Sequence, residues 1–339
     1  MGLKNGIFII AEAGVNHNGD LETAKKLVDA AVAAGADAVK FQTFVPEQVV
    51  VKGAERAPYQ QANMPGSRES QLEMIRHLAL SKEDFYTLKA YCDRAGIMFL
   101  STPFDYYSVD LLVRLEVPVF KIGSGELTNL PFLKYVALKG RPLILSTGMA
   151  TLGEVEEALQ TLQEAGAREI ALLHCTSSYP APFEEANLKA MLTLRQAFGL
   201  PVGYSDHTPG MEVAIAAAAL GACVIEKHFT LDRSMEGPDH KASLEPGELA
   251  AMVKAIRNVE KAIGDGLKRP GPAEKEIMRA ARRSLVAAVD IAAGEVITPD
   301  KLAVKRPGTG IPPKMWEVVV GRRARMDIPT DTVITWEMI

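Results

Sequence analysis

Two histidines stand at the ends of short apolar runs: His207 ends residues 201–207, and His228 lies near the end of residues 223–230. The alanine-rich segment between them, residues 211–220, predicts a tightly packed helix. In a parallel sheet, a strand–helix–strand unit brings the carboxyl ends of its strands to the same edge, so we expect the two imidazoles to meet. Because imidazole is the commonest side-chain ligand of divalent transition metals, the pair predicts a metal site.

Two lysines, Lys40 and Lys121, lie inside other apolar runs. A buried lysine is costly unless its ammonium group meets an anion. Hydroxyl residues end several of the same runs, although serine and threonine there can also cap the following helix. Lysines and hydroxyls on one face predict a phosphate or carboxylate ligand. The candidate residues at the ends of these runs, besides the histidines, are Glu12, Lys40, Thr102, Lys121, Ser124, Ser146 and Ser205.

The elements that must position these residues alternate along the first 263 residues. Amphipathic helices fill the gaps between the runs, most clearly at 20–34, 152–164 and 247–263. Eight such repeats predict an α/β protein with a (β/α)8 TIM barrel, whose active site lies at the carboxyl ends of the strands. A doubly wound open sheet is the alternative, but it has fewer strands and the chain has no GxGxxG turn. The predicted strands are 7–12, 37–44, 97–104, 119–124, 142–148, 169–176, 201–207 and 223–230.

The composition changes after Gly264. We expect a TIM-barrel domain over 1–266, a charged linker with a short helix over 267–282, and a small β-rich module over 283–339, whose short runs are punctuated by glycine and proline. The basic loop at 305–311 is either a contact to an anionic site or a solvated turn.

Charge and cysteine content exclude several classes of function. The net charge of −4 argues against a nucleic-acid partner. The three cysteines form no CxxC pair, which is typical of a reducing compartment. No apolar run reaches about 18 residues, the length needed to cross a bilayer. We therefore expect a soluble, cytoplasmic protein without a membrane partner.

Several long motifs closely resemble those of the sialic acid synthases, in the same order and nearly from end to end. They are AEAGVNHNGD, VKFQTF, STPFD, KIGSGELTN, STGMAT, GYSDHTPG, EKHFTLDRSMEGPDHKASLEP and KRPGTGI. The resemblance implies an enzyme that condenses phosphoenolpyruvate with an N-acetylated mannosamine-type sugar and water, releasing phosphate. It also implies a C-terminal SAF domain, related to type III antifreeze protein, that is swapped between the two protomers of a homodimer.

The resemblance also implies roles for individual residues. His207 and His228 match metal ligands for Mn²⁺ or Mg²⁺, and Glu12 matches a carboxylate that either stabilises a cation or transfers a proton. Tyr179 and Asp239 match sugar contacts, and Arg306 matches an arginine that the partner's SAF domain sends to the N-acyl group. No individual sugar contact is named in the insert at 45–80, whose part around 62–70 does not align securely with the family, although the residues that read carbons 4 and 6 of the sugar are expected to include this insert. The positions that match phosphoenolpyruvate contacts are Lys40, Thr102, Lys121, Ser124, Ser146 and Ser205.

The expected product is N-acetylneuraminate, made from N-acetylmannosamine. The alternatives are N,N′-diacetyllegionaminate synthesis from 2,4-diacetamido-2,4,6-trideoxymannose, a metal-dependent aldolase that uses pyruvate, and a non-catalytic carbohydrate- or ice-binding protein. Three further residues have structural alternatives. His174 is expected to be a structural histidine. His17 belongs either to a turn or, as the resemblance implies, to the wall of the site, and Asp206 either bonds backbone near the metal or caps a helix.

Overall fold

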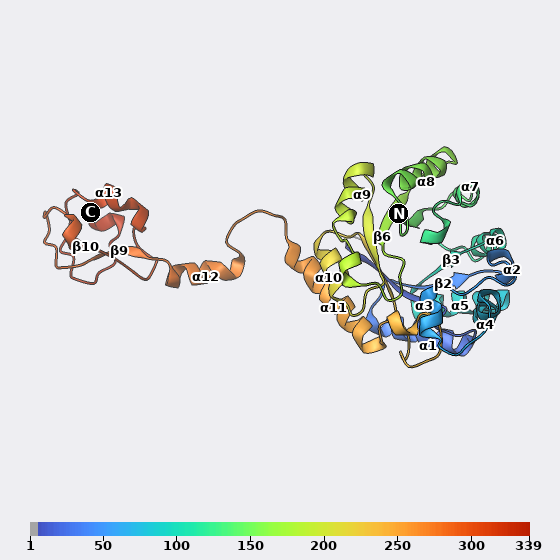
Figure 1. Ribbon diagram of the computed structural model, residues 1–339. Helices are drawn as coiled ribbons and strands as arrows, with labels where there is room; N and C mark the ends of the chain where they lie inside the picture. Colours follow the sequence, from blue (N-terminus) through green and yellow to red (C-terminus); the bar gives the residue numbers. More distant parts are fainter. Residues whose placement is uncertain (1–5) are drawn as a thin grey trace. The chain divides into compact units, whose positions relative to one another are not determined.

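The computed structural model describes residues 6–339, which form two compact units (Figure 1). The first unit ends at Gly264, and the second runs from Asp265 to Ile339. Each unit has its own hydrophobic core and is described by itself. Within residues 6–339, no helix has the length and apolar character to span a membrane.

The first unit is the predicted (β/α)8 barrel. Its strands are all parallel, in the order β3-β2-β1-β8-β7-β6-β5-β4, and β3 contacts β4 to close the ring. Each strand lies within or close to a run predicted from the sequence. The strands are β1 (Phe8–Gly14), β2 (Ala38–Thr43), β3 (Met98–Pro103), β4 (Phe120–Ile122), β5 (Leu143–Ser146), β6 (Ile170–Cys175), β7 (Val202–Asp206) and β8 (Val224–His228).

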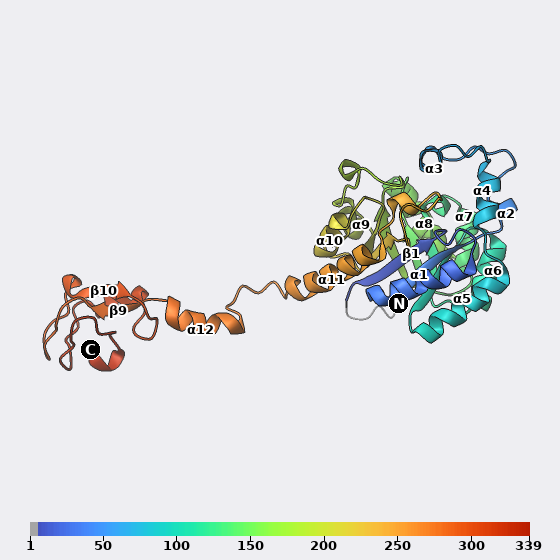
Figure 2. The same ribbon diagram turned by 90° about the horizontal axis from the view of Figure 1, so that it is seen from below.

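Helices surround the strands (Figures 1 and 2). Three of them, α2 (Pro46–Val49), α3 (Pro58–Asn63) and α4 (Gln71–Leu78), form an insert between β2 and the next barrel helix. The other barrel-unit helices are α1 (Leu21–Ala34), α5 (Lys82–Ala95), α6 (Tyr106–Arg114), α7 (Leu130–Ala137), α8 (Leu152–Glu164), α9 (Ala190–Phe198), α10 (Glu212–Ala219) and α11 (Pro246–Ile263).

Local sequence signals set the ends of these helices. The Asp20 side chain accepts a hydrogen bond from Thr23 N–H at the start of α1, and Gly35 ends that helix with a left-handed φ of 78°. Ser81 and Asp84 form a capping box at the start of α5. These caps fix where each helix leaves the barrel, and therefore the direction in which the next strand enters it.

The barrel interior is built in layers of alternate residues. Seven buried apolar side chains fill the layer below the strand ends. Along a strand, residues two positions apart point to the same side. The residues that form the next layer toward the carboxyl ends are therefore those two positions after the residues of this lower layer. In that next layer, Glu12 follows Ile10, Lys40 follows Ala38, and Lys121 follows Val119. The lower layer consists of Ile10, Ala38, Leu100, Val119, Ile144, Leu173 and Val224.

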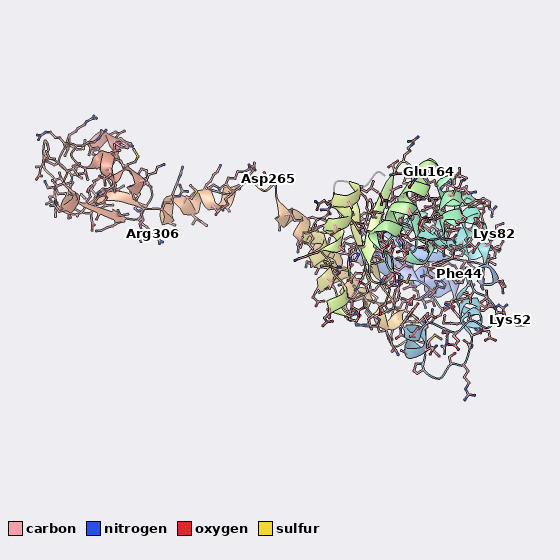
Figure 3. The ribbon with its side chains drawn as sticks, turned by 45° about the horizontal axis from the view of Figure 1, so that its top comes forward. Phe44, Lys52, Lys82, Glu164, Asp265 and Arg306 are labelled. Carbon is pink, nitrogen blue, oxygen red and sulfur yellow. The ribbon has the colours of Figure 1, made fainter. Side chains whose placement is uncertain are left out.

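The second unit is small and partly β-structured. Its strands β9 (Ser284–Ala287) and β10 (Leu302–Lys305) are antiparallel, and its helices are α12 (Pro272–Ala281) and α13 (Trp316–Val319). Helix α12 contacts the loop that follows β10, since Gly308 N–H donates to Arg279 O at 2.8 Å. Figure 3 labels Asp265, where this unit begins, and Arg306 within it.

Candidate active site

Two lysines and two carboxylates meet inside the barrel, and all four residues are buried. Lys40 Nζ lies 2.7 Å from Glu12 Oε2 and 3.7 Å from Glu226 Oε2, while Lys121 Nζ lies 3.3 Å from Glu226 Oε1. Lys40 also donates to Thr102 Oγ1 at 2.8 Å. The lysines therefore do meet anions, as their burial requires, but the chain itself supplies these anions.

The carboxyl groups of Glu12 and Glu226 have very different pKa values. Burial raises the pKa of Glu12 to about 7, against the opposing effect of Lys40. Burial also acts on Glu226, but Lys121 and Lys40 outweigh it and lower its pKa to about 2. Near neutral pH, Glu226 is therefore ionised and Glu12 is close to its midpoint. When Glu12 is protonated, the two ammonium groups face only one negative charge, which favours an anionic ligand.

Hydroxyl groups complete this polar layer. Ser205 Oγ donates to Glu226 Oε1 at 2.8 Å, and Ser124 Oγ accepts from Gly148 N–H at 3.0 Å. Ser146 Oγ is buried and has no hydrogen-bond partner. A Cβ atom at position 148 would lie 2.4 Å from Ser177 Oγ and 2.8 Å from Ser124 Oγ, so this close approach requires glycine. An unpaired buried hydroxyl is costly, and Ser146 is therefore ready to bond a ligand.

His207 and His228 lie side by side, with ring centroids 5.5 Å apart. His207 Nδ1–H donates to Thr176 O at 2.7 Å, which leaves Nε2 unprotonated, in a long 3.5 Å contact with Ser205 Oγ. His228 Nδ1 is buried without a partner. Burial lowers the pKa of His207 to about 4 and that of His228 well below 6.5. Both rings are therefore neutral and carry free lone pairs, as metal ligands must.

The pair fits an ion that shares its coordination with water or substrate. Over residues 6–339, no group of three or more His, Cys, Asp or Glu side chains is arranged to hold a metal. A structural site would need a full ligand set from the protein, whereas a catalytic site keeps open positions. The two histidines would hold such an ion, and its remaining positions would be open.

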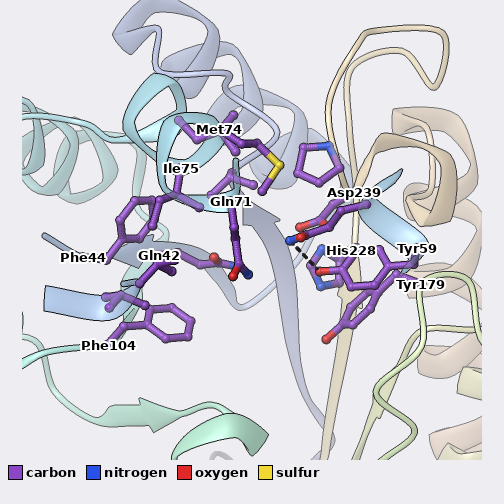
Figure 4. A pocket seen from close by; sticks show the side chains of 16 residues that line it. Gln42, Phe44, Tyr59, Gln71, Met74, Ile75, Phe104, Tyr179, His228 and Asp239 are labelled. Carbon is purple, nitrogen blue, oxygen red and sulfur yellow. Dashed lines mark hydrogen bonds between the residues drawn. The ribbon is translucent and has the colours of Figure 1, made fainter. Parts of the chain in front are cut away.

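A cavity of about 250 Å³ is lined by His228, Tyr179 and Asp239, among other residues (Figure 4). The Tyr179 ring lies 4.2 Å from that of His207 and 5.6 Å from that of His228. Burial raises the pKa of Asp239 to about 6. The two predicted sugar contacts thus lie together beside the predicted metal ligands.

The opposite wall of this cavity is apolar. Phe44, Met74 and Ile75 lie across the cavity from Tyr59, Tyr179 and Asp239 in Figure 4, and Phe104 lies beside Phe44. Val15, Met74 and Leu78, which also line the cavity, form a small buried apolar cluster within this wall. Gln42 and Gln71 contribute the polar groups on this side. Much of the wall comes from the insert, in which the sequence analysis named no individual sugar contact.

Several other candidates lie elsewhere. Arg306 is exposed and belongs to the second unit. His174 bonds Ala186 O at 2.9 Å. His17 Nδ1 accepts from Gly19 N–H at 3.0 Å, as in a turn, whereas its Nε2 is buried without a hydrogen-bond partner. Asp206 lies on the outer side of β7, where it pairs with the fully buried Lys227 at 2.8 Å.

Glu226 is the main site residue that sequence reasoning missed. It lies two positions before His228 on β8 and therefore points to the same side of the strand, whereas Lys227 points to the other. That alternation could have identified it, because the same rule links Ser205 to His207 on β7.

Comparison with known proteins places this geometry in a family. The model described as "NeuB family" matches residues 27–268, and a SAF domain model matches residues 282–339. The chain belongs to the NeuB family. Within this family, it is 52% identical to an N,N′-diacetyllegionaminic acid synthase of Campylobacter jejuni, covering 96% of this chain and 98% of that protein.

Other relatives of this NeuB-family chain are named for sialic acid chemistry. The human N-acetylneuraminate-9-phosphate synthase is 37% identical, covering 100% of this chain and 94% of that protein. The crystal structure of an N-acetylneuraminic acid synthetase from Leptospira borgpetersenii, in complex with citrate, aligns with a TM-score of 0.70 at 36% identity. It covers 81% of this chain and 90% of that one. The resemblance seen in the motifs is thereby confirmed, and with it the expectation of a sialic acid synthase-type barrel followed by a SAF domain.

Proposed function

We propose that the chain is a nonulosonic acid synthase that condenses phosphoenolpyruvate with the open-chain form of an N-acylated mannosamine-type sugar. The observation that carries this proposal is the junction of two sites. A buried layer with two lysines and an unpaired serine hydroxyl lies beside two neutral histidines, and one of these, His228, lines a sugar-sized cavity. The layer suits an enol phosphate with its carboxylate, and the cavity suits a small polyol.

The chemistry assigns a task to each part of the site. Carbon 3 of phosphoenolpyruvate forms a bond to the aldehyde carbon of the sugar, water adds to carbon 2, and phosphate leaves by cleavage of its bond to carbon 2. Lys40, Lys121 and Ser146 bind the phosphate and carboxylate and hold carbon 3 near the aldehyde. A divalent ion held by His207 and His228 would polarise the aldehyde oxygen as a Lewis acid.

Glu12 lies where charge changes during this reaction. Its carboxylate is 2.7 Å from Lys40 Nζ, and its backbone is in register with His228 on the neighbouring strand. With a pKa of about 7, it can stabilise the cationic character that develops at carbon 2 when ionised, or donate a proton when protonated. We propose that it acts beside carbon 2 in one of these two roles.

We further propose 2,4-diacetamido-2,4,6-trideoxymannose as the sugar, which reverses the preference of the sequence analysis. The apolar wall of Phe44, Met74, Ile75 and Phe104 suits a sugar with a methyl group at carbon 6 and an additional acetyl group. The Campylobacter jejuni relative is named for the corresponding product. N-acetylmannosamine is the second candidate, supported by the polar groups of Gln42, Gln71 and Asp239 in the same cavity.

Phosphate release from phosphoenolpyruvate with Mn²⁺ tests both statements. Turnover with either sugar, dependent on His207 and abolished by a chelator, supports the synthase and its metal. A higher kcat/KM for the diacetamido sugar supports the legionaminate product, whereas a higher value for N-acetylmannosamine restores N-acetylneuraminate. Pyruvate consumption without phosphate release would instead indicate the aldolase, and no turnover with either sugar would contradict the proposed function.

The SAF domain is proposed to act in a homodimer. The family resemblance implies that Arg306 of one protomer reaches the N-acyl group bound in the barrel of the other. Arg306 is exposed and therefore free of competing buried contacts within its own unit. Its guanidinium group can donate to an acyl oxygen.

A further inference from the structure

Helix α3 of the insert is tied to two loops that end at the candidate site. Asn63, the last residue of α3, donates from Nδ2 to Pro238 O at 2.6 Å, in the loop after β8. The same nitrogen donates to Tyr179 O at 3.3 Å, in the loop after β6. Lys241 Nζ adds a 3.3 Å bond to Ala62 O. The insert thus joins loops that are far from it and from each other in the sequence.

These bonds end at the two residues assigned to the sugar. Tyr179 itself accepts one bond through its main chain, and Pro238 directly precedes Asp239. The Tyr59 ring of α3 lies 5.0 Å from the Tyr179 ring, which in turn lies 4.2 Å from the ring of His207. Helix α3 therefore contacts Tyr179 through both its backbone and its ring.

The loop after β8 is anchored independently on its other side. His240 Nε2 lies 3.2 Å from Asn18 Oδ1, and Ser243 Oγ donates to Asp239 O at 2.7 Å. The loop after β6 has its own bond to the barrel, from Ala181 N–H to His207 O at 2.8 Å. Asn63 links these two separately anchored loops through a single side-chain nitrogen.

We propose that Asn63 is a positioning residue, whose side-chain amide sets the spacing between Tyr179 and Asp239 and thereby the shape of the sugar pocket. This inference rests on the proposed function for the identity of the ligand, but not for the geometry. Asparagine suits the task because its amide nitrogen carries two hydrogens, one for each carbonyl, whereas an aspartate of the same shape is an acceptor at neutral pH.

The proposed role of Asn63 predicts different effects on the binding of the two substrates. The phosphoenolpyruvate layer lies on barrel strands, with Lys40 on β2, Lys121 on β4 and Glu226 on β8. Loss of the Asn63 bonds should thus loosen the sugar pocket alone. A residue that merely stabilised the fold would alter both KM values, or the amount of active enzyme, instead.

Steady-state kinetics of Asn63→Asp and Asn63→Ala test the proposal, with whichever sugar the wild-type enzyme turns over. Asn63→Asp keeps the shape, removes the donors and sets a carboxylate against two carbonyls. We expect the sugar KM of Asn63→Asp to rise about tenfold or more, with kcat and the phosphoenolpyruvate KM within about twofold of wild type. The sugar KM of Asn63→Ala should rise less. Gln61→Ala is the matched control, because Gln61 lies on the same helix but bonds Arg56 O within the insert. A sugar KM unchanged in Asn63→Asp, or an equal rise in both KM values, overturns the role.

Hydrogen–deuterium exchange gives a readout that does not depend on turnover. In Asn63→Asp, we expect faster exchange in residues 176–182 and 232–240, with the barrel strands unchanged; Gln61→Ala should match wild type. Unchanged exchange in both loops would overturn the positioning role even if the enzyme proves to act on another substrate. If both loops exchange faster in Asn63→Asp but the wild type releases no phosphate, the proposed function is contradicted while the link between the loops stands.

Discussion

Glu12 and Glu226 both contact Lys40, yet the pKa of Glu12 is raised and that of Glu226 is lowered. Both contact Lys40, but Glu226 also contacts Lys121 and accepts from Ser205, while Glu12 has Lys40 as its close cation. The additional positive charge and the hydrogen bond keep Glu226 ionised, and burial dominates at Glu12. Carboxyl groups whose pKa values are pushed apart in this way can serve separate roles, one as a fixed charge and one as a titrating group.

Lys121→Met should weaken phosphoenolpyruvate binding specifically. A hydrogen bond to a charged group contributes about 1.5–3 kcal/mol, so the KM for phosphoenolpyruvate should rise about tenfold to a hundredfold. The sugar KM should change little, because Lys121 lies outside the cavity lined by Tyr179 and Asp239. Lys134→Met, at an exposed lysine of α7, is the control. An unchanged phosphoenolpyruvate KM would contradict the anion-binding role.

Asp239 should make sugar binding dependent on pH. Its pKa is raised to about 6, and the ionised carboxylate accepts hydrogen bonds from sugar hydroxyls better than the protonated form does. The sugar KM should therefore rise as the pH falls from about 7 to 5. In Asp239→Asn, the KM should be high and nearly independent of pH over this range. A wild-type sugar KM that is flat between pH 5 and 7 would exclude this role for Asp239.

The raised pKa of Asp239 also predicts how the free energy of unfolding depends on pH. Because burial raises the pKa of Asp239 above its ordinary value of 3.8, the folded state retains a proton that the unfolded chain releases. The stabilisation is present at low pH and is lost as the pH rises from about 4 through 6. Urea unfolding of wild type and Asp239→Asn at pH 4.5 and pH 8 measures this, and the variant should gain relative stability at the higher pH. The opposite trend would show that the ionised form is favoured in the folded state.

At the scale of elements, close approach of β7 and β8 brings the two histidines together. A Cβ atom at Gly203 would lie 2.3 Å from Val224 O and 2.7 Å from Leu173 Cδ2. Helix α10, which joins the two strands, buries Ala214, Ala217 and Ala218. Small residues on the strand and on the helix therefore allow the strand–helix–strand unit to pack closely enough for its histidines to meet.

Gly203→Ala should disturb both the fold and the site. Overpacking of this kind costs about 1–3 kcal/mol of the free energy of unfolding, and any separation of β7 from β8 would move His207 relative to His228. We expect a lower urea midpoint and a reduced kcat. Gly153→Ala in α8 is the control, because nothing lies within 4 Å of its added Cβ and alanine favours a helix. Equal stability of the two variants would contradict the packing argument.

At the scale of the whole molecule, the chain carries its proposed chemistry on two units with separate cores. The second unit buries its own set of apolar side chains, which include Leu285, Ile297 and Ile334. The proposed catalytic groups lie in the barrel unit, and Arg306 lies in the other. A division of this kind allows one protomer to complete the site of another if the enzyme is a swapped homodimer.

Mixing Arg306→Ala with Lys121→Ala tests this arrangement. Each variant alone should have little activity, the first through a raised sugar KM and the second through a raised phosphoenolpyruvate KM. In a swapped dimer, a hybrid has one site with both defects and one intact site, so random subunit exchange should restore about a quarter of wild-type activity. Exchange is verified by mass spectrometry of differently tagged protomers. Verified exchange without recovered activity would show that Arg306 does not act across the dimer.

The sequence by itself determined the barrel, most of the candidate layer and the family. These depend on local patterns: two-residue alternation set which side of each strand faces inward, and turns and caps set where each strand ends. Because active sites of such barrels collect at strand ends, polar residues there could be named without contacts. His207 and His228 met as expected for this reason, since neighbouring strands carry them.

Only the tertiary structure decided which charges pair and what forms the sugar side. Lys121 on β4 contacts Glu226 on β8, four strands away around the ring, because their side chains meet across the barrel interior. The sequence analysis named no individual contact in the insert, whereas the structure shows that α3 joins two loops through Asn63 and helps to enclose the cavity. Such contacts depend on barrel closure and on main-chain carbonyl positions, which no periodicity in the chain encodes.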